Sequence, residues 1–124
     1  FIDLRLDHTL ASLTAINRKH SARVIILVGE IDTVVWVKGK WSCEIPVGTR
    51  LSLWPLGEQF FHSSTGLKYS LKDLTLHPLN LIGTSNETIE RKLSLHPSEN
   101  YSSRYVTIIP SKYFLNLYNS LIGE

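Results

Sequence analysis

The chain begins with a segment of helical periodicity. Leu10, Leu13 and Ile16 recur at intervals of three behind Asp7, which can cap a helix N-terminus. The cationic run at 17–20 favours a helix C-terminus, because positive charge there complements the helix dipole. We therefore expect a short helix ahead of the main body of the domain.

The strongest strand signal lies at 23–41, where β-branched and aromatic side chains dominate. Gly29 interrupts this run, and a glycine within a strand usually marks a bulge or a sharp bend. The pattern leaves open whether the segment is one bent strand or two strands that meet near 32–33. Turn signals follow at Gly39 and at 46–48.

Alternation of apolar and polar residues predicts further strands. It is present at 49–54 and at 67–72, but its phase reverses after Asp73. A pattern of period two that changes phase requires a bulge or a tight hairpin at that point. One more strand is predicted at 105–109.

Two later segments predict helices. Thr84 and Glu87 match a capping box, so we expect a short helix that starts there and ends before Pro97. Ser111 would cap a terminal helix that ends at Gly123. Its broad apolar stripe either covers the domain's own core or docks on a partner, and both alternatives stay open. The candidate partner-binding residues are Tyr113, Phe114, Leu117, Tyr118, Leu121 and Ile122.

These elements predict an all-β dominated fold with flanking helices. We expect a five-stranded OB-type barrel with an N-terminal and a C-terminal helix, forming a single OB-like domain over residues 1–124. The composition, with 43% hydrophobic and 19% charged residues, is that of a globular domain. A single cysteine, Cys43, excludes an intramolecular disulfide. The longest apolar run, at 24–28, is too short to span a bilayer.

Candidate catalytic chemistry is weak in this sequence. The five histidines do not follow metal-ligand spacing, and the glycines form no phosphate-binding motif. Cys43 is better interpreted as a half-buried thiol beside Trp41 than as a nucleophile. We therefore expect no enzymatic activity, no metal, no cofactor and no small-molecule substrate.

Basic and aromatic residues interleave at 36–41, where two lysines stand between two tryptophans. Single-stranded nucleic-acid sites use cations to follow the phosphates and aromatic rings to stack on bases. The net charge is only +2, so the placement of the basic groups matters more than their total. The alternative is that the tryptophans point into the core. The candidate nucleic-acid-binding residues are Trp36, Lys38, Lys40, Trp41, Arg50, Lys68 and Tyr69.

Two segments carry a resemblance to small OB-fold subunits. The run Arg23–Asp32 resembles the glycine-bent first strand of that fold, and Val47–Trp54 resembles a later strand entered through a G-x-x-L-x-L turn. Among such families the chain is most similar to the smallest subunits of the yeast-type CST telomere-capping complex and of replication protein A. The resemblance implies a nuclear protein at telomeres that pairs with a larger OB-fold subunit and meets single-stranded DNA through the complex. The alternatives are an autonomous single-stranded nucleic-acid-binding protein and a viral or structural assembly module with a small barrel.

Overall fold

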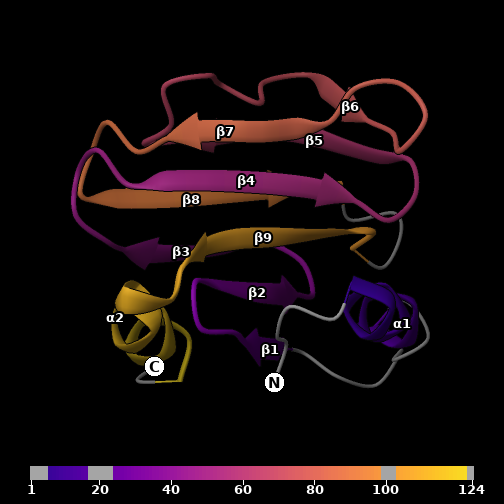
Figure 1. Cartoon of the computed structure of the whole chain (residues 1–124). Helices are drawn as coiled ribbons and strands as arrows, with labels where there is room; N and C mark the ends of the chain where they lie inside the picture. The colour runs from indigo at the N-terminus through magenta and orange to yellow at the C-terminus, as the bar shows by residue number, and fades with distance from the viewer. Residues whose placement is uncertain (1–5, 17–23, 99–102, 123–124) are drawn as a thin grey trace.

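Two antiparallel β-sheets form the body of the protein, as Figure 1 shows for the computed structural model. The structure describes residues 6–16, 24–98 and 103–122. The larger sheet has the strand order β1-β2-β9-β4-β7, with β1 at Val24–Val28, β2 at Asp32–Val37, β9 at Tyr105–Pro110, β4 at Arg50–Pro55 and β7 at Gly83–Glu87. The smaller sheet has the order β3-β8-β5-β6, with β3 at Trp41–Glu44, β8 at Lys92–Pro97, β5 at Gln59–Thr65 and β6 at Leu74–Leu76.

The long strand signal at 23–41 divides into three strands. The Gly29 amide donates to the Asp32 carbonyl at 3.0 Å, and this tight turn places β1 antiparallel to β2, with Val24 opposite Val37. Gly39 has a φ of 78°, and the chain crosses there from the larger sheet to β3 in the smaller one. The alternative with one bent strand is therefore wrong: the first break lies at 29–31, just before the predicted meeting point at 32–33, and a third strand begins at Trp41.

The main core lies between the two sheets. Leu51 and Leu53 point inward from β4, and Leu93 and Leu95 do so from β8; all four are fully buried. The indole nitrogen of a fifth inward residue, Trp41 on β3, donates to the Tyr105 hydroxyl on β9 at 3.0 Å. This contact joins the two sheets through a buried polar bond, which keeps both side chains satisfied away from water.

The N-terminal helix α1 (Leu6–Ile16) lies against the outer face of the larger sheet. Leu13 packs there against a second apolar cluster that contains Val34, Trp36 and Val106. The predicted N-terminal helix is therefore present, and it contributes to this cluster rather than to the main core.

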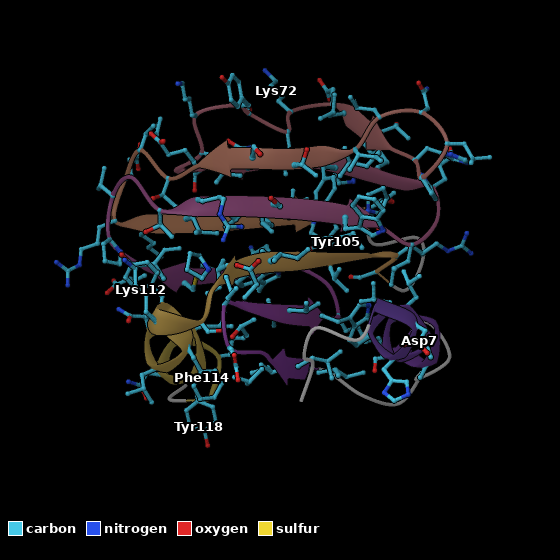
Figure 2. All side chains as sticks on the ribbon, in the orientation of Figure 1. Asp7, Lys72, Tyr105, Lys112, Phe114 and Tyr118 are labelled. Carbon is cyan, nitrogen blue, oxygen red and sulfur yellow. The ribbon has the colours of Figure 1, made fainter. Side chains whose placement is uncertain are left out.

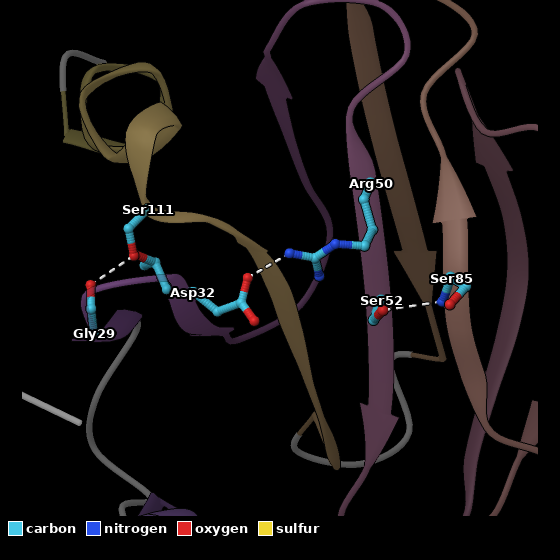
Figure 3. Close-up of polar contacts among 7 residues, drawn as sticks. Gly29, Asp32, Arg50, Ser52, Ser85 and Ser111 are labelled. Atoms are coloured by element: carbon cyan, nitrogen blue, oxygen red, sulfur yellow. Dashed lines mark hydrogen bonds and ion pairs between the residues drawn. The ribbon is translucent and has the colours of Figure 1, made fainter. Parts of the chain in front are cut away.

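The C-terminal helix covers the core of its own chain. A 3-10 turn, η1 (Ser111–Tyr113), leads into α2 (Phe114–Ile122). Leu117 is fully buried, and Tyr113 and Leu121 pack against the main core. The Ser111 hydroxyl does not cap the helix but donates to the Gly29 carbonyl at 2.7 Å (Figure 3). Neither described helix has the length and apolar content needed to cross a bilayer.

The predicted five-stranded barrel is not confirmed, because the described strands form two separate sheets. The helix predicted from the capping box at Thr84 is also wrong, since that segment is strand β7, followed by β8. The Ser85 amide donates to the Ser52 hydroxyl on β4, and Glu87 lies opposite Arg50 in the sheet. Hydrogen bonds to β4 thus satisfy backbone groups of this segment that a helix N-cap would otherwise satisfy.

The phase reversal near Asp73 has a simple cause in the structure. Asp73 adopts a left-handed backbone conformation, with a φ of 52°, and the chain turns there into β6. The preceding alternation at 67–72 does not form a full strand of its own; Leu67 makes an isolated bridge to Thr88 instead. The chain therefore turns at 72–73, but the predicted bulge or hairpin is wrong, because β6 pairs with β5 and not with the segment before the turn.

The buried thiol of Cys43 supplies a first testable prediction. Burial raises its pKa from 9.0 to about 12, with a smaller contribution from the negative charge of Glu44. At pH 8 such a difference lowers the thiolate fraction by roughly a thousandfold. We expect the folded protein to react with the thiol reagent DTNB far more slowly than the protein unfolded in urea. Equal rates at pH 8 would contradict this burial.

The same pKa difference has a consequence for stability at high pH. The unfolded thiol ionises near pH 9.0, whereas the folded thiol stays protonated until about pH 12. The contribution of Cys43 to stability is therefore complete below pH 9 and is lost as the pH rises through this range. Cys43→Ala should make the alkaline side of the stability profile flatter.

Candidate binding site at the Tyr69 and Asn86 junction

The segment 66–69 runs along the outer edge of β7 and extends the larger sheet locally. The Ile89 amide donates to the Gly66 carbonyl at 2.8 Å, and the Lys68 amide donates to the Glu87 carbonyl at 2.8 Å. Gly66 has a φ of 80° and lies so close to β8 that an added Cβ would stand 2.5 Å from the carbonyl oxygen of Lys92. This position therefore requires glycine both for its conformation and for its space.

Asn86 fixes the backbone of Tyr69 through its side chain. Its Oδ1 accepts from the Tyr69 amide at 3.0 Å, and its Nδ2 donates to the Tyr69 carbonyl at 2.9 Å. Oδ1 also accepts from the Glu87 amide at 2.9 Å. Asn86 is only 5% exposed, whereas Tyr69 is 60% exposed. A buried amide thus holds an exposed aromatic residue in a defined place.

Ser85, next to Asn86, has an unusual backbone. Its φ is 60°, a left-handed conformation that costs free energy for a residue with a side chain. Its amide donates to the Ser52 hydroxyl at 3.0 Å (Figure 3), where the pairing of β4 and β7 shifts register between Leu51 and Leu53. Non-glycine residues held in this way cluster at functional sites, and Ser85 is itself exposed.

The exposed ring of Tyr69 already attracts a positive charge. The Lys68 ammonium nitrogen lies 5.6 Å from the ring centroid, within the range of a cation–π contact. The Glu87 carboxylate is exposed on the adjacent strand, one residue after Asn86. The junction thus exposes an aromatic ring, a carboxylate and, at Ser85, a residue with a hydroxyl group.

The two leading tryptophans of the predicted nucleic-acid site are core residues. Trp36 is 3% exposed and its indole nitrogen donates to the Ser103 carbonyl at 2.8 Å; Trp41 is 7% exposed and bonded to Tyr105. Neither ring is available for stacking on a base, so the core alternative holds for both residues.

The cationic members of that predicted site lie in three separate places. Lys38 and Lys40 flank the turn after β2, and Arg50 lies on β4, with its guanidinium 2.5 Å from the Asp32 carboxylate (Figure 3). Lys68 and Tyr69 lie beside β7, at the opposite edge of the larger sheet from β1 and β2 (Figure 1). The structure thus divides the predicted residues: Lys38, Lys40 and Trp41 line one cleft, and Lys68 contacts Tyr69 elsewhere.

The predicted partner-binding residues divide into two groups. Tyr113, Leu117 and Leu121 pack on the main core, while Ile122 has no described side chain. Figure 2 shows Phe114 and Tyr118 together on the side of α2 away from the sheets, with ring centroids 5.9 Å apart. The helix therefore uses most of its described apolar stripe within its own chain.

Sequence reasoning missed three residues that build the Tyr69 junction: Gly66, Ser85 and Asn86. Asn86 stands within a polar run that resembled a helix start, and nothing local indicates that its amide is buried against Tyr69. Among the described ranges, no group of three His, Cys, Asp or Glu side chains is placed to hold a metal ion.

A family model of known proteins matches the part of the chain that contains the junction. Residues 43–101 match a family model described as thiamin pyrophosphokinase, vitamin B1 binding domain. That range contains the whole junction. No curated protein matches the chain as a whole.

Several solved structures with a similar fold are thiamin pyrophosphokinases. The enzyme from Bacillus subtilis superposes with a TM-score of 0.67 and 19% identity over 86% of this chain and 50% of its own. The yeast enzyme gives 0.67 and 15% over 88% and 38%, and the Candida albicans enzyme gives 0.65 and 17% over 84% and 38%. The chain therefore spans between about two fifths and half of the length of these structures.

These findings correct the functional expectations drawn from the sequence. The resemblance to CST and replication protein A subunits is wrong, and with it the telomeric single-stranded-DNA role and the larger OB-fold partner; the alternative functions are also not supported. The expectations of no enzyme and no small-molecule substrate are overturned as well, because the matching family and structures are named for a kinase that acts on a vitamin. The fold of this chain is that of the corresponding part of thiamin pyrophosphokinases.

Proposed function

We propose that this chain binds thiamin at the junction of Tyr69 and Asn86 and serves as the vitamin-binding part of a thiamin pyrophosphokinase-like enzyme. The observation that carries the proposal is the family match at 43–101, which coincides with the strained and tightly anchored segment around these two residues. The similar fold of three thiamin pyrophosphokinases supports it.

The chemistry of thiamin suits the groups at this junction. Its thiazolium ring is a flat, permanent cation, and its aminopyrimidine ring offers hydrogen-bond donors and acceptors. A tyrosine face attracts such a cation with about 0.5–2 kcal/mol, depending on how well the contact excludes water. The exposed carboxylate of Glu87 adds a favourable charge, and the Ser85 hydroxyl can bond the pyrimidine.

The role of this part in the reaction is then to hold the alcohol that receives the pyrophosphoryl group. Holding an acceptor in a fixed orientation removes much of the entropic cost of a reaction between two molecules. Asn86 contributes as a positioning residue, because it fixes the backbone that carries the Tyr69 ring.

Tyr69→Ala should weaken thiamin binding by about 3- to 30-fold, the loss expected when a cation–π contact is removed. The measurement is isothermal titration calorimetry of the 124-residue chain with thiamin. Tyr69→Trp should retain the affinity, because the indole face binds cations at least as well. Tyr118→Ala, at another exposed tyrosine on α2, is the matched control and should stay within about twofold.

Lys68 provides a sharper test of the same contact. The Lys68 ammonium nitrogen lies 5.6 Å from the centroid of the Tyr69 ring. It would compete with a cationic ligand for the face of that ring. Lys68→Ala is therefore expected to bind thiamin at least as tightly as the unmodified chain. If the unmodified chain shows no heat of binding with millimolar thiamin, or if Tyr69→Ala and Tyr118→Ala behave alike, the proposal is refuted.

A further inference from the structure

A cleft lies between the turn after β2, the strands β3 and β8, and the end of α2, and Tyr69 is not among the residues that line it. Its volume is about 940 Å³, within the range of roughly 300–1,000 Å³ that is typical of small-molecule sites. Three lysines line it, Lys38, Lys40 and Lys92, and none of the carboxylates in the described part of the chain does. All three lysines are exposed.

The positions of these cations are well defined by the fold. Lys38 and Lys40 flank Gly39, whose left-handed turn is tied to Ser103 by a hydrogen bond of 3.1 Å from the Gly39 amide. Lys92 begins β8, opposite Glu44 on β3. The described residues give Lys92 no ion pair with Glu44, and this carboxylate lines a neighbouring pocket instead.

Hydroxyl groups form a row beside the lysines. Ser42 on β3 lies opposite Ser94 on β8, and Ser94 lies opposite Thr65 on β5. The Ser94 and Thr65 hydroxyls are hydrogen-bonded at 2.5 Å, so between them one proton is left to donate outward. The Ser42 hydroxyl has no partner among the described side chains and backbone groups and can donate as well.

We propose that this cleft binds an anion with two or more phosphate groups. Three ammonium groups match the charge of a diphosphate, and the hydroxyl row supplies neutral donors on one side. Trp41 and Leu121 add apolar groups to the lining of the cleft. The source of the phosphates is either a free diphosphate or a phosphorylated small molecule such as a nucleotide. Tyr69 does not line the cleft, although Gly66 of the same segment packs against the backbone of Lys92, and the proposal does not depend on thiamin binding.

Inorganic pyrophosphate, titrated into the 124-residue chain at low ionic strength, tests the proposal. Lys38→Gln, Lys40→Gln and Lys92→Gln should each weaken binding by about three- to tenfold, and the triple variant should abolish it. Lys72→Gln and Lys112→Gln, at exposed lysines outside the cleft, are the matched controls and should bind normally. Orthophosphate should bind at least tenfold more weakly than pyrophosphate, because it reaches fewer of the donors.

Two further arms separate the possible outcomes. Adenosine triphosphate binding more tightly than pyrophosphate, with the same loss in the lysine variants, would identify a nucleotide as the source; equal affinity would assign recognition to the phosphates alone. Tyr69→Ala should leave pyrophosphate binding unchanged, so failure of the thiamin proposal is distinguishable from failure here. Equal weakening by the control variants, or no binding of pyrophosphate by the unmodified chain, would overturn the site.

Discussion

Gly66→Ala is expected to lower the free energy of unfolding by about 2–5 kcal/mol. The left-handed backbone alone costs an L-residue roughly 1–2 kcal/mol, and forcing atoms into a filled space adds about 1–3 kcal/mol. The added Cβ would stand 2.5 Å from the Lys92 carbonyl oxygen and 2.9 Å from the Leu93 Cα. Both are backbone atoms of β8, which cannot move aside as a flexible side chain can. Urea denaturation followed by tryptophan fluorescence measures the loss.

Gly39→Ala and Gly48→Ala are the controls for this prediction. Their φ angles, 78° and 85°, match that of Gly66, but an added Cβ would meet nothing within 4 Å at either position. Each should cost only about 1–2 kcal/mol, the conformational part alone. If all three alanine variants lost the same stability, close contact with β8 would not be the reason for glycine at 66. Gly66→Ala should also weaken thiamin binding, because segment 66–69 carries Tyr69.

Leu117→Ala should destabilise the protein by about 2–5 kcal/mol, because it leaves a cavity where α2 meets the main core. Leu117 is fully buried in that core. Leu115 lies on the same helix and is 66% exposed, so Leu115→Ala should change stability by no more than about 0.5 kcal/mol. Chemical denaturation measures the free energy of unfolding of both variants, and both substitutions lie on the same helix.

The contrast between the two leucines also distinguishes the two roles considered for the terminal helix. A helix that covers its own core loses stability at Leu117 whether or not another protein is present. A loss of stability at Leu115 equal to that at Leu117 would show that α2 does not sit on the core as the structure places it.

Strands and the terminal helix could be predicted because their signals are local. The β-branched run that became β1 and β2, and the apolar spacing of α2, follow from residues close together in sequence. Gly29 correctly indicated a break in the first run. Local signals could not predict whether the strands form a barrel or two sheets. The pairing of strands depends on contacts between residues far apart in the sequence.

The prediction at 84–87 failed for a physical reason. Polar residues such as Thr84 and Asn86 favour helix starts because their side chains satisfy free backbone groups nearby. In the folded protein the Asn86 side chain hydrogen-bonds the backbone of Tyr69, a residue distant in sequence. The segment that contains Asn86 pairs with β4 as a strand. Local sequence does not distinguish the two uses of the same amide.

The candidate site was only partly accessible from the sequence. The sequence pattern predicts Lys68 and Tyr69 as ligand-binding residues, but for single-stranded nucleic acid. Trp36 and Trp41 carried the same kind of signal and proved to be buried. Exposure decides whether an aromatic ring binds a ligand or fills a core, and composition alone does not reveal it.

The order of strands in the larger sheet has a consequence for how the protein is made. β9 (Tyr105–Pro110) lies between β2 and β4. β2 and β4 do not pair with each other, and β9 connects them. Until residues 105–110 have been synthesised, the edges of β2 and β4 that face β9 are unpaired. We expect nascent chains that stop before Tyr105 to depend on chaperones, and the larger sheet to close when β9 emerges.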